Sequence, residues 1–383
     1  MARICFLFNH DQLHQISHSL PVALELAATG GHEVVLAAGN RAQEARLREL
    51  VGAANAMLKI VRLDLHRIDS RVAEFALQAI IPAHKILLYR DNLDFFRSFD
   101  ALVVTEKTSL LLKTRYGLDN LKIIHTRHGA GDRAIGFEKQ GALFDLHLVA
   151  GPKIASRLES EGGVDPSRIR ITGYPKFVLY GDNRIENPFP DKNRPIVLYA
   201  PHPSPGLSSY YRMGRRLLEA FARSDRYNLI FAPHVMLFQR KHIITISPPA
   251  IRHVPQIDPA IEACPNIIVD RGSLAATDMS YTNLADLYCG DASSQVYEFL
   301  LHPRPVLHLD AHNVQWQNDP SFAHWHAGPV GGESADIITE VDRAMATHAD
   351  YEDVQRAMFA DTFYVTDMPA SRRAALAISE FLS

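Results

Sequence analysis

Short apolar runs recur along the chain and alternate with polar loops and helical stretches. The first run, residues 3–8 (RICFLF), is followed by a polar loop and by a helix predicted over 20–29, which ends at Gly30 and Gly31. A second apolar run covers residues 32–38. This strand–helix–strand order predicts a parallel sheet.

The same alternation continues into the middle of the chain. Its apolar runs are short, rich in Val and Ile and bounded by Gly, as expected of parallel strands covered on both faces. These runs lie at 101–105 (ALVVT), 122–126 (KIIHT), 146–151 (LHLVAG) and 168–173 (RIRITG). Residues 65–99 are expected to be helical, and a further helix is expected over 152–161.

A proline-rich polar stretch, residues 181–195 (GDNRIENPFPDKNRP), interrupts the pattern and has the composition of an exposed linker. The alternation then restarts. Further strands are expected at 196–200, 228–233, 266–270, 286–291 and 305–310, with helices over 211–224, up to Leu301, and over 335–347, 350–359 and 370–382. The last helices are expected to cover the second sheet or to cross back to the first.

The chain is therefore predicted to form two Rossmann-like α/β domains, residues 1–183 and 184–383, that face a central cleft. Its length of 383 residues also favours two domains. Hydrophobic residues make up 47% and charged residues 22%, which is typical of globular proteins. The 40 Lys and Arg residues are balanced by 43 Asp and Glu, which argues against a nucleic-acid partner.

The three cysteines, Cys5, Cys264 and Cys289, are far apart and odd in number, so neither a disulfide framework nor a cysteine zinc site is expected. A reducing cytoplasm fits this usage. The first apolar run is far shorter than a signal sequence or the roughly 20 residues that span a membrane. The protein is therefore expected to be cytoplasmic and not to cross a membrane.

Open parallel sheets bind ligands at the carboxyl ends of their strands, so the loops there deserve most weight. The loop 127–133 (RHGAGDR) follows one expected strand. Gly129 and Gly131 let backbone approach a ligand, and His128 is placed to act as a base, an acid or a phosphate donor. The alternative is a turn with an exposed histidine.

Two further histidines follow expected strands in the second half. His202 lies in PHPSPG after the strand 196–200, and His234 lies in PHVML after the strand 228–233. The two loops are expected on one rim of the sheet, where the histidines either meet a ligand or serve a structural role.

The segment 290–305 (GDASSQVYEFLLHPRP) places Ser293 and Ser294 at the expected start of a helix, where free N–H groups can hold a diphosphate. Glu298 lies one turn further on, where a carboxylate can accept bonds from ribose hydroxyls. An ordinary helix cap with an exposed Glu is the alternative.

His10, His14 and His18 are spaced by four and share a face if their segment is helical, as metal ligands would. No carboxylate or cysteine completes a metal site in this motif, so lining the cleft or simple solvation is favoured. The segment 324–326 (HWH) and the cluster of Arg212, Arg215 and Arg216 are equally ambiguous, since both suit a solvated face as well as a ligand.

Four blocks of the chain, within residues 120–310, resemble the CDP-glycerol:poly(glycerophosphate) glycerophosphotransferase family, a branch of the GT-B glycosyltransferase superfamily. RHGAGDR is similar to the family's Trp-His-Gly loop, and ITGYPKF (171–177) to its TGYPR turn. YAPHPSPG (199–206) is similar to YAPTWR, and ADLYCGDASSQVYEFLLHPRPVL (285–307) to the final block around ITDYSS. The order and spacing of the blocks carry the resemblance.

The resemblance implies a GT-B-like fold with an acceptor-side first domain and a donor-binding second domain. It implies that His128 is the catalytic base, that His234 assists at the phosphate, and that Ser293 and Ser294 contact the donor diphosphate. Gly129, His202 and Glu298 complete the candidate donor-binding set. No metal and no cofactor are expected.

The chain departs from the family pattern at three places. Asp132 and Arg133 stand in the region of the usual Lys, PHPSPG lacks the Arg of YAPTWR, and Glu298 stands in place of an Asp. The final block is also similar to the ribose and diphosphate loop of the non-hydrolysing UDP-N-acetylglucosamine 2-epimerases. CDP-linked and UDP-linked donors are therefore both open.

We expect a transferase that moves a phosphoalditol or a sugar from a nucleotide-linked donor to a hydroxyl of a cell-envelope glycan or lipid. Such an acceptor is compatible with peripheral attachment to the inner face of the membrane. Two alternatives stay open: a sugar-nucleotide epimerase, and a nucleotide-binding protein without catalysis.

Overall fold

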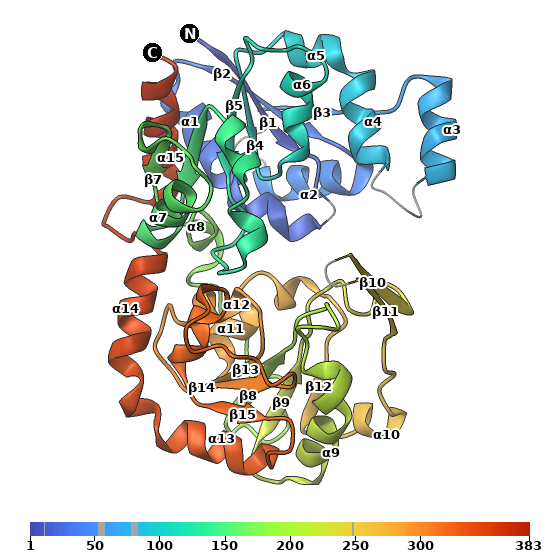
Figure 1. Ribbon diagram of the computed structural model, residues 1–383, viewed down its shortest axis with the longest axis vertical. Coiled ribbons are helices and arrows are strands. Elements are labelled where there is room, and N and C mark those ends of the chain that lie inside the picture. Colours follow the sequence, from blue (N-terminus) through green and yellow to red (C-terminus); the bar gives the residue numbers. More distant parts are fainter. Residues whose placement is uncertain (11, 53–57, 78–82, 247–248) are drawn as a thin grey trace. The chain divides into compact units, whose positions relative to one another are not determined.

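The computed structural model describes residues 1–10, 12–52, 58–77, 83–246 and 249–383. It divides into two compact units, which Figure 1 shows with the chain coloured along the sequence. Unit 1 comprises Met1–Ala130, Phe137–Leu179 and Asp361–Ser383, and unit 2 comprises Gly131–Gly136 and Tyr180–Ala360. Compared with the expected division at 183/184, three segments change sides: residues 131–136 and 180–183 belong to unit 2, and residues 361–383 belong to unit 1.

Unit 1 is built on a seven-stranded, wholly parallel sheet. Its strands are β1 (Arg3–Phe8), β2 (Glu33–Ala38), β3 (Lys59–Arg62), β4 (Ala101–Val104), β5 (Lys122–Thr126), β6 (Leu146–Val149) and β7 (Ile169–Ile171). They are ordered β3-β2-β1-β4-β5-β6-β7. The order reverses between β1 and β4, and a doubly wound sheet opens its ligand crevice at such a reversal.

Helices cover both faces of this sheet, as the continuous apolar strands require. In β1, Ile4, Phe6 and Phe8 belong to one buried cluster, while Cys5 and Leu7 belong to another, because successive side chains point to opposite faces. The helices are α1 (Leu20–Thr29), α2 (Arg41–Val51), α3 (Ile68–Leu77), α4 (Ala83–Asp91), α5 (Leu93–Arg97), α6 (Leu111–Thr114), α7 (Pro152–Ser160), α8 (Lys176–Tyr180) and α15 (Ala370–Phe381).

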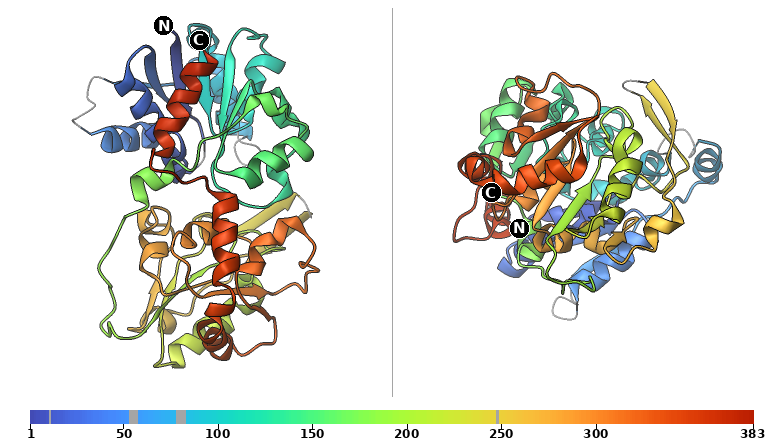
Figure 2. Two further views of the ribbon diagram at one scale, coloured as in Figure 1. Left: turned by 90° about the vertical axis from the view of Figure 1, so that its left-hand side faces the viewer. Right: turned by 90° about the horizontal axis from the view of Figure 1, so that it is seen from below.

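The C-terminal helix α15 returns to unit 1, one of the two positions expected from the sequence. Its apolar stripe, which includes Ala374 and Ile378, is buried in the cluster that holds Leu20 and Leu26 of α1. Figures 1 and 2 show α15, coloured red, beside α1 on the sheet. Arg373 of α15 also donates to the Thr172 carbonyl at 2.9 Å.

Unit 2 repeats the architecture with a six-stranded parallel sheet. Its strands are β8 (Ile196–Ala200), β9 (Asn228–Phe231), β12 (Ile267–Val269), β13 (Leu287–Gly290), β14 (Val306–Asp310) and β15 (Val330–Gly332). They are ordered β12-β9-β8-β13-β14-β15. Counted within the unit, this is the order 3-2-1-4-5-6 of a dinucleotide-binding Rossmann sheet, with its reversal between β8 and β13.

The remaining elements of unit 2 surround this sheet. They are α9 (Arg215–Arg223), α10 (Pro259–Glu262), α11 (Ser280–Leu284), α12 (Gln295–Phe299), α13 (Ile337–Ala346), α14 (Glu352–Thr362) and an antiparallel pair formed by β10 (His242–Ile246) and β11 (Pro249–His253). The helix expected to reach Leu301 ends at Phe299. In the part of the chain that the structure describes, no helix is both long and apolar enough to span a membrane.

The predicted α/β class with two parallel sheets is confirmed. The stretch 65–99 forms α3, α4 and α5, and its residues 78–82 lie outside the described part. Four strands have no counterpart in the sequence analysis: β3, β10, β11 and β15. β3 and β15 are short, and β10 and β11 carry the exposed Ile244 and Ile251.

Candidate functional site

Two candidate loops of unit 2 follow β8 and β13, the neighbouring strands at the order reversal. His202 comes two residues after β8, and Ser293 and Ser294 come shortly after β13. His234 follows β9, on the other side of β8, and its ring centroid lies 6.2 Å from that of His202. The two histidines expected on one rim therefore do lie together at the carboxyl edge of the sheet.

Asp291 joins the loops that follow β8 and β13. Its carboxylate is 1% exposed and accepts bonds from the backbone N–H groups of His202 (2.8 Å), Ser209 (2.6 Å) and Ala292 (2.7 Å) and from the Ser209 hydroxyl (2.8 Å). Burial raises the pKa of this carboxyl, and these bonds act against that rise. Asp291 was not predicted from the sequence, although an Asp directly after an apolar strand is a visible signal.

The tautomer of His202 follows from its backbone contact. The Ser204 N–H donates to Nδ1 of His202 at 3.0 Å, so Nδ1 carries no proton. Desolvation lowers the pKa of His202 well below its usual value, and the charge of Arg133 acts in the same direction. Part of the ring stays accessible to solvent. The ring is therefore neutral near pH 7 and holds its single proton on Nε2.

His234 has the same arrangement. The Met236 N–H donates to Nδ1 of His234 at 3.3 Å, and desolvation lowers the pKa of His234 to about 4. Its proton is therefore also on Nε2 near pH 7. Both strand-end histidines present a neutral N–H group, which suits a hydrogen-bond donor better than a base.

Arg133 creates a surplus of donors at this edge. Its Nη1 lies 3.1 Å from Nε2 of His202, so an N–H of the guanidinium faces an N–H of the imidazole. Neither group can accept a bond from the other while Nδ1 of His202 takes the Ser204 N–H. An oxygen that accepts from both groups would resolve the conflict, and a phosphate oxygen has the charge to do so.

The serine loop lies beside the same segment. A Cβ added at Gly131 would lie 3.0 Å from Cβ of Ser294, so the 131–136 segment packs closely on this loop. Ser294 is exposed and Ser293 half-buried, which leaves both able to meet a ligand, whereas Glu298 on α12 is buried. The helix that follows, α12, has five residues, shorter than the sequence suggested.

In unit 1, His128 follows β5 and has the opposite tautomer. Its Nδ1 lies 2.7 Å from the carbonyl oxygen of Thr105, so Nδ1–H donates and Nε2 keeps a lone pair. Gly129 has a φ of 86°, a left-handed conformation that side chains disfavour, and it turns the chain directly after the histidine. His128 is thus an acceptor at Nε2, the form that a general base needs.

Desolvation lowers the pKa of His128, and the charges of Arg127, Lys85 and Lys107 lower it further, while the bond to Thr105 acts against them. The residue nevertheless keeps solvent-accessible surface. His128 is therefore unprotonated near pH 7.

Glu106, which the sequence analysis did not single out, fixes the loop that sets this tautomer. It follows β4 and is 7% exposed, and its carboxylate accepts from the Tyr89 hydroxyl (2.5 Å) and from the N–H groups of Thr108 (2.6 Å) and Ser109 (3.1 Å). Lys85 of α4 lies 3.7 Å away. Burial raises the pKa of Glu106, and Lys85 acts against the rise.

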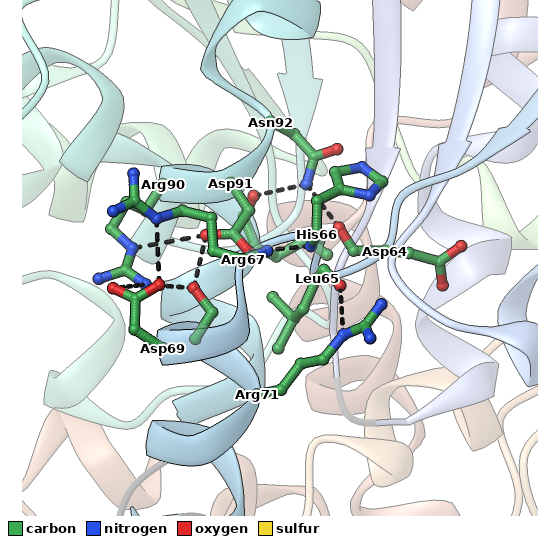
Figure 3. Close-up of polar contacts among 11 residues, drawn as sticks. Asp64, Leu65, His66, Arg67, Asp69, Arg71, Arg90, Asp91 and Asn92 are labelled. Carbon is green, nitrogen blue, oxygen red and sulfur yellow. Dashed lines mark hydrogen bonds and ion pairs between the residues drawn. The ribbon is translucent and has the colours of Figure 1, made fainter.

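The helix that carries Lys85 and Tyr89 is anchored at its C-terminal end, as Figure 3 shows. The carboxylate of Asp91 accepts from the N–H groups of His66 and Arg67, both at 3.0 Å, and from the Ser70 hydroxyl at 2.6 Å. These bonds tie α4 to the start of α3 and so hold the α4 side chains toward Glu106.

The three histidines after β1 differ in burial. Residues Leu13–His18 form a 3₁₀ helix, in which His18 is buried and His14 half-buried, while His10 is buried two residues after β1. Burial lowers the pKa of His10 to about 3, with the charges of His128 and Lys85 acting in the same direction. Within the described residues, no group of three potential ligands is arranged to hold a metal ion.

The HWH segment, ambiguous in sequence, is part of the unit 2 edge. His324 and Trp325 are buried, and both donate to the backbone carbonyl of Asp291, His324 through Nε2 at 2.8 Å and Trp325 through Nε1 at 2.9 Å. His326 stays exposed and packs against Trp316.

The two parallel sheets define a GT-B-like α/β fold, and solved structures share it over the whole chain. The wall teichoic acid polymerase TagF is 14% identical with a TM-score of 0.62, over 99% of this chain and 88% of that chain. MnaA from S. aureus in complex with UDP is 16% identical with a TM-score of 0.60, over 100% and 97% of the two chains.

A third similar structure is the UDP-GlcNAc 2-epimerase from Neisseria meningitidis bound to UDP-GlcNAc, which is 14% identical with a TM-score of 0.58 over 99% of both chains. At these identities the likeness concerns the fold. No protein-family profile and no curated protein sequence matches the chain.

Proposed function

We propose that the protein is a transferase that binds the diphosphate of a nucleotide-linked donor at the order reversal of unit 2. The N–H donors of His202, His234 and Arg133 carry this proposal, because Arg133 and Nε2 of His202 face each other as two donors at 3.1 Å and because these residues lie where a Rossmann sheet binds nucleotides. Ser293 and Ser294 add hydroxyl donors from the loop after β13. Glu298 is proposed to contact the donor ribose from α12.

In the proposed reaction, Nε2 of His128 takes the proton of an acceptor hydroxyl. The acceptor oxygen then forms a bond to the phosphorus of a CDP-linked phosphoalditol, and CMP leaves, or to the anomeric carbon of a UDP-linked sugar, and UDP leaves. Negative charge develops on the leaving phosphate oxygen. Neutral imidazole N–H groups and the Arg133 guanidinium can stabilise that charge without a metal ion.

The names of similar structures support nucleotide-linked chemistry and keep the donor open. One structure is of a TagF variant soaked with CDPG, and others hold UDP or UDP-GlcNAc. The phosphoalditol transferase is our first proposal because four sequence blocks resemble that family. A UDP-GlcNAc 2-epimerase is the second, because two of the similar folds carry that activity in their names.

A product assay separates these functions. Purified protein is incubated with CDP-glycerol or UDP-N-acetylglucosamine, with and without a glycan or glycerol-phosphate acceptor, and CMP, UDP and the 2-epimer are quantified by chromatography. Acceptor-dependent release of CMP or UDP supports a transferase. The 2-epimer formed without an acceptor supports the epimerase, and nucleotide binding without any product supports a protein that has lost the chemistry.

Peripheral membrane contact stays a prediction, and we propose that helix α3 makes this contact. Its side chains Ile68, Val72 and Phe75 are 80%, 64% and 92% exposed and follow one another at helical spacing. Sedimentation with anionic lipid vesicles tests this assignment. Binding that Phe75→Ser weakens severalfold would support it, and equal binding of both proteins would contradict it.

A further inference from the structure

The segment 131–136 is held to unit 2 by a buried carboxylate. Asp132 is 2% exposed, and its Oδ2 accepts from the Tyr297 hydroxyl (2.7 Å), from the His324 N–H (3.2 Å) and from Nδ1 of His324 (2.9 Å). A carboxylate is costly to bury, and such a dense set of donors is what keeps it inside. The segment is thus fixed in place although its neighbours on both sides in sequence belong to unit 1.

Both ring nitrogens of His324 face oxygen atoms. Nδ1 lies 2.9 Å from the Asp132 carboxylate, and Nε2 lies 2.8 Å from the carbonyl oxygen of Asp291. His324 therefore links the Asp132 carboxylate to the backbone of Asp291, and the Asp132 and His324 side chains are 1% and 4% exposed.

This pair is connected to both Arg133 and His202, the two residues whose N–H donors face each other. Arg133 follows Asp132 directly in the chain, so fixing Asp132 fixes the base of the Arg133 side chain. Through Asp291 the pair also reaches His202, because the Asp291 carbonyl accepts from His324 while its carboxylate accepts from the His202 N–H. Asp132 and His324 thus fix the positions of both Arg133 and His202, whose side chains lie 3.1 Å apart.

We infer that Asp132 and His324 are positioning residues for the donor diphosphate, and that they hold Arg133 against His202 so that one phosphate oxygen can bind both. This inference rests on the proposed function. It assigns a role to the HWH segment and to the place where the chain departs from the family's Lys. A cation at position 133 acts at the diphosphate only while Asp132 keeps it there.

The test compares the affinities of CDP and UDP with those of cytidine and uridine by titration calorimetry, for the full-length protein and its variants. In Asp132→Asn we expect the affinity for the preferred diphosphate to fall about tenfold or more, because Arg133 is no longer held. The affinity for the matching nucleoside should change less than about twofold, because it does not use Arg133. A general loosening of unit 2 would lower the affinities for both the diphosphate and the nucleoside.

A double-mutant cycle makes the test specific. Arg133→Gln removes the guanidinium from an exposed side chain and should itself weaken diphosphate binding about tenfold. In that background Asp132→Asn should add little, since its effect passes through Arg133. A full, additive loss would overturn the inference.

Two further variants guard against a folding defect. Tyr297→Phe removes one bond to Asp132 without changing charge and should weaken diphosphate binding severalfold. It replaces Asp132→Asn in the test if that variant does not fold. Asp342→Asn is the matched control, because Asp342 also accepts from a tyrosine hydroxyl and an arginine, Tyr227 and Arg226, but lies on α13. It should leave both affinities unchanged.

The outcomes separate the two proposals. A wild-type protein that binds none of the four ligands overturns the proposed function. A wild-type protein that binds a diphosphate, with Asp132→Asn and Tyr297→Phe binding it equally well, overturns the positioning role alone.

Discussion

At the scale of single residues, backbone contacts divide the three strand-end histidines into two kinds. His128 donates from Nδ1 to a carbonyl and is an acceptor at Nε2, whereas His202 and His234 accept at Nδ1 and are donors at Nε2. In sequence all three look alike, since each is a histidine after an apolar strand. The contact made by Nδ1 distinguishes an acceptor at Nε2, which the proposed base needs, from a donor at Nε2, which the proposed phosphate ligands need.

The role of His128 leads to a prediction for His128→Asn. The Asn amide can still donate to the Thr105 carbonyl, so the loop should keep its shape, while the basic Nε2 is lost. We expect turnover to fall by about 10²-fold or more and donor affinity to stay within about threefold. Steady-state kinetics and calorimetry measure the two quantities. Unchanged turnover would remove His128 from the mechanism.

For His202 we expect the N–H donor at Nε2 to matter more for binding than the imidazole ring itself. His202→Gln can place an amide N–H near the position of Nε2, and we expect it to keep donor affinity within a few-fold. His202→Leu removes the donor and should weaken diphosphate binding about tenfold. Equal affinities for the two variants would contradict a donor role. Calorimetry with CDP and UDP makes the comparison.

At the scale of elements, the strand order explains where the candidate residues gather. In unit 2 the order reverses between β8 and β13, and the loops after these strands carry His202 and Ser293. In unit 1 it reverses between β1 and β4, and the loops there carry His10 and Glu106. His10 is buried, as are several other histidines of both units, and this has a consequence for stability.

Several buried histidines have pKa values that burial lowers, to about 3 for His10 and about 4 for His147, and well below 6.5 for His18, His125 and His308. The unfolded chain therefore binds more protons as the pH falls below about 6.5, and stability present at neutral pH is lost toward pH 4. Each such group contributes up to about 1.4 kcal/mol per pH unit in that window.

We accordingly expect the melting temperature to fall steeply between pH 7 and pH 5. His147→Gln, which can still donate to the Gly141 carbonyl, should flatten this dependence. His66→Gln changes an exposed side chain and serves as the control. Calorimetric scans at several pH values measure the slopes, and parallel slopes for wild type and His147→Gln would contradict the account.

At the scale of the whole molecule, the two parallel sheets were predictable because their strands are continuous apolar runs with polar ends. Strands without that pattern were missed: β3 has no fully buried residue, and β10 and β11 carry exposed Ile244 and Ile251. The transfer of 131–136 to unit 2 was also unpredictable. It depends on Asp132 meeting His324, a contact across 192 residues that no local pattern encodes.

The same reasoning applies to the site. His128, His202, His234 and the serine pair were chosen as candidates because they closely follow apolar strands. Asp291 and Glu106 occupy equivalent positions and were missed because they serve the backbone, a role that residue type alone does not reveal.

The central claim is that unit 2 binds a nucleoside diphosphate, and thermal unfolding with CDP, CMP, UDP, GDP and ADP tests it most directly, because a ligand of the native state raises the melting temperature. We predict selective stabilisation by a pyrimidine diphosphate and a smaller shift with CMP. Stabilisation by CDP favours the phosphoalditol transferase, and stabilisation by UDP favours a sugar-nucleotide enzyme. An unchanged melting temperature with every nucleotide at millimolar concentration would contradict the claim.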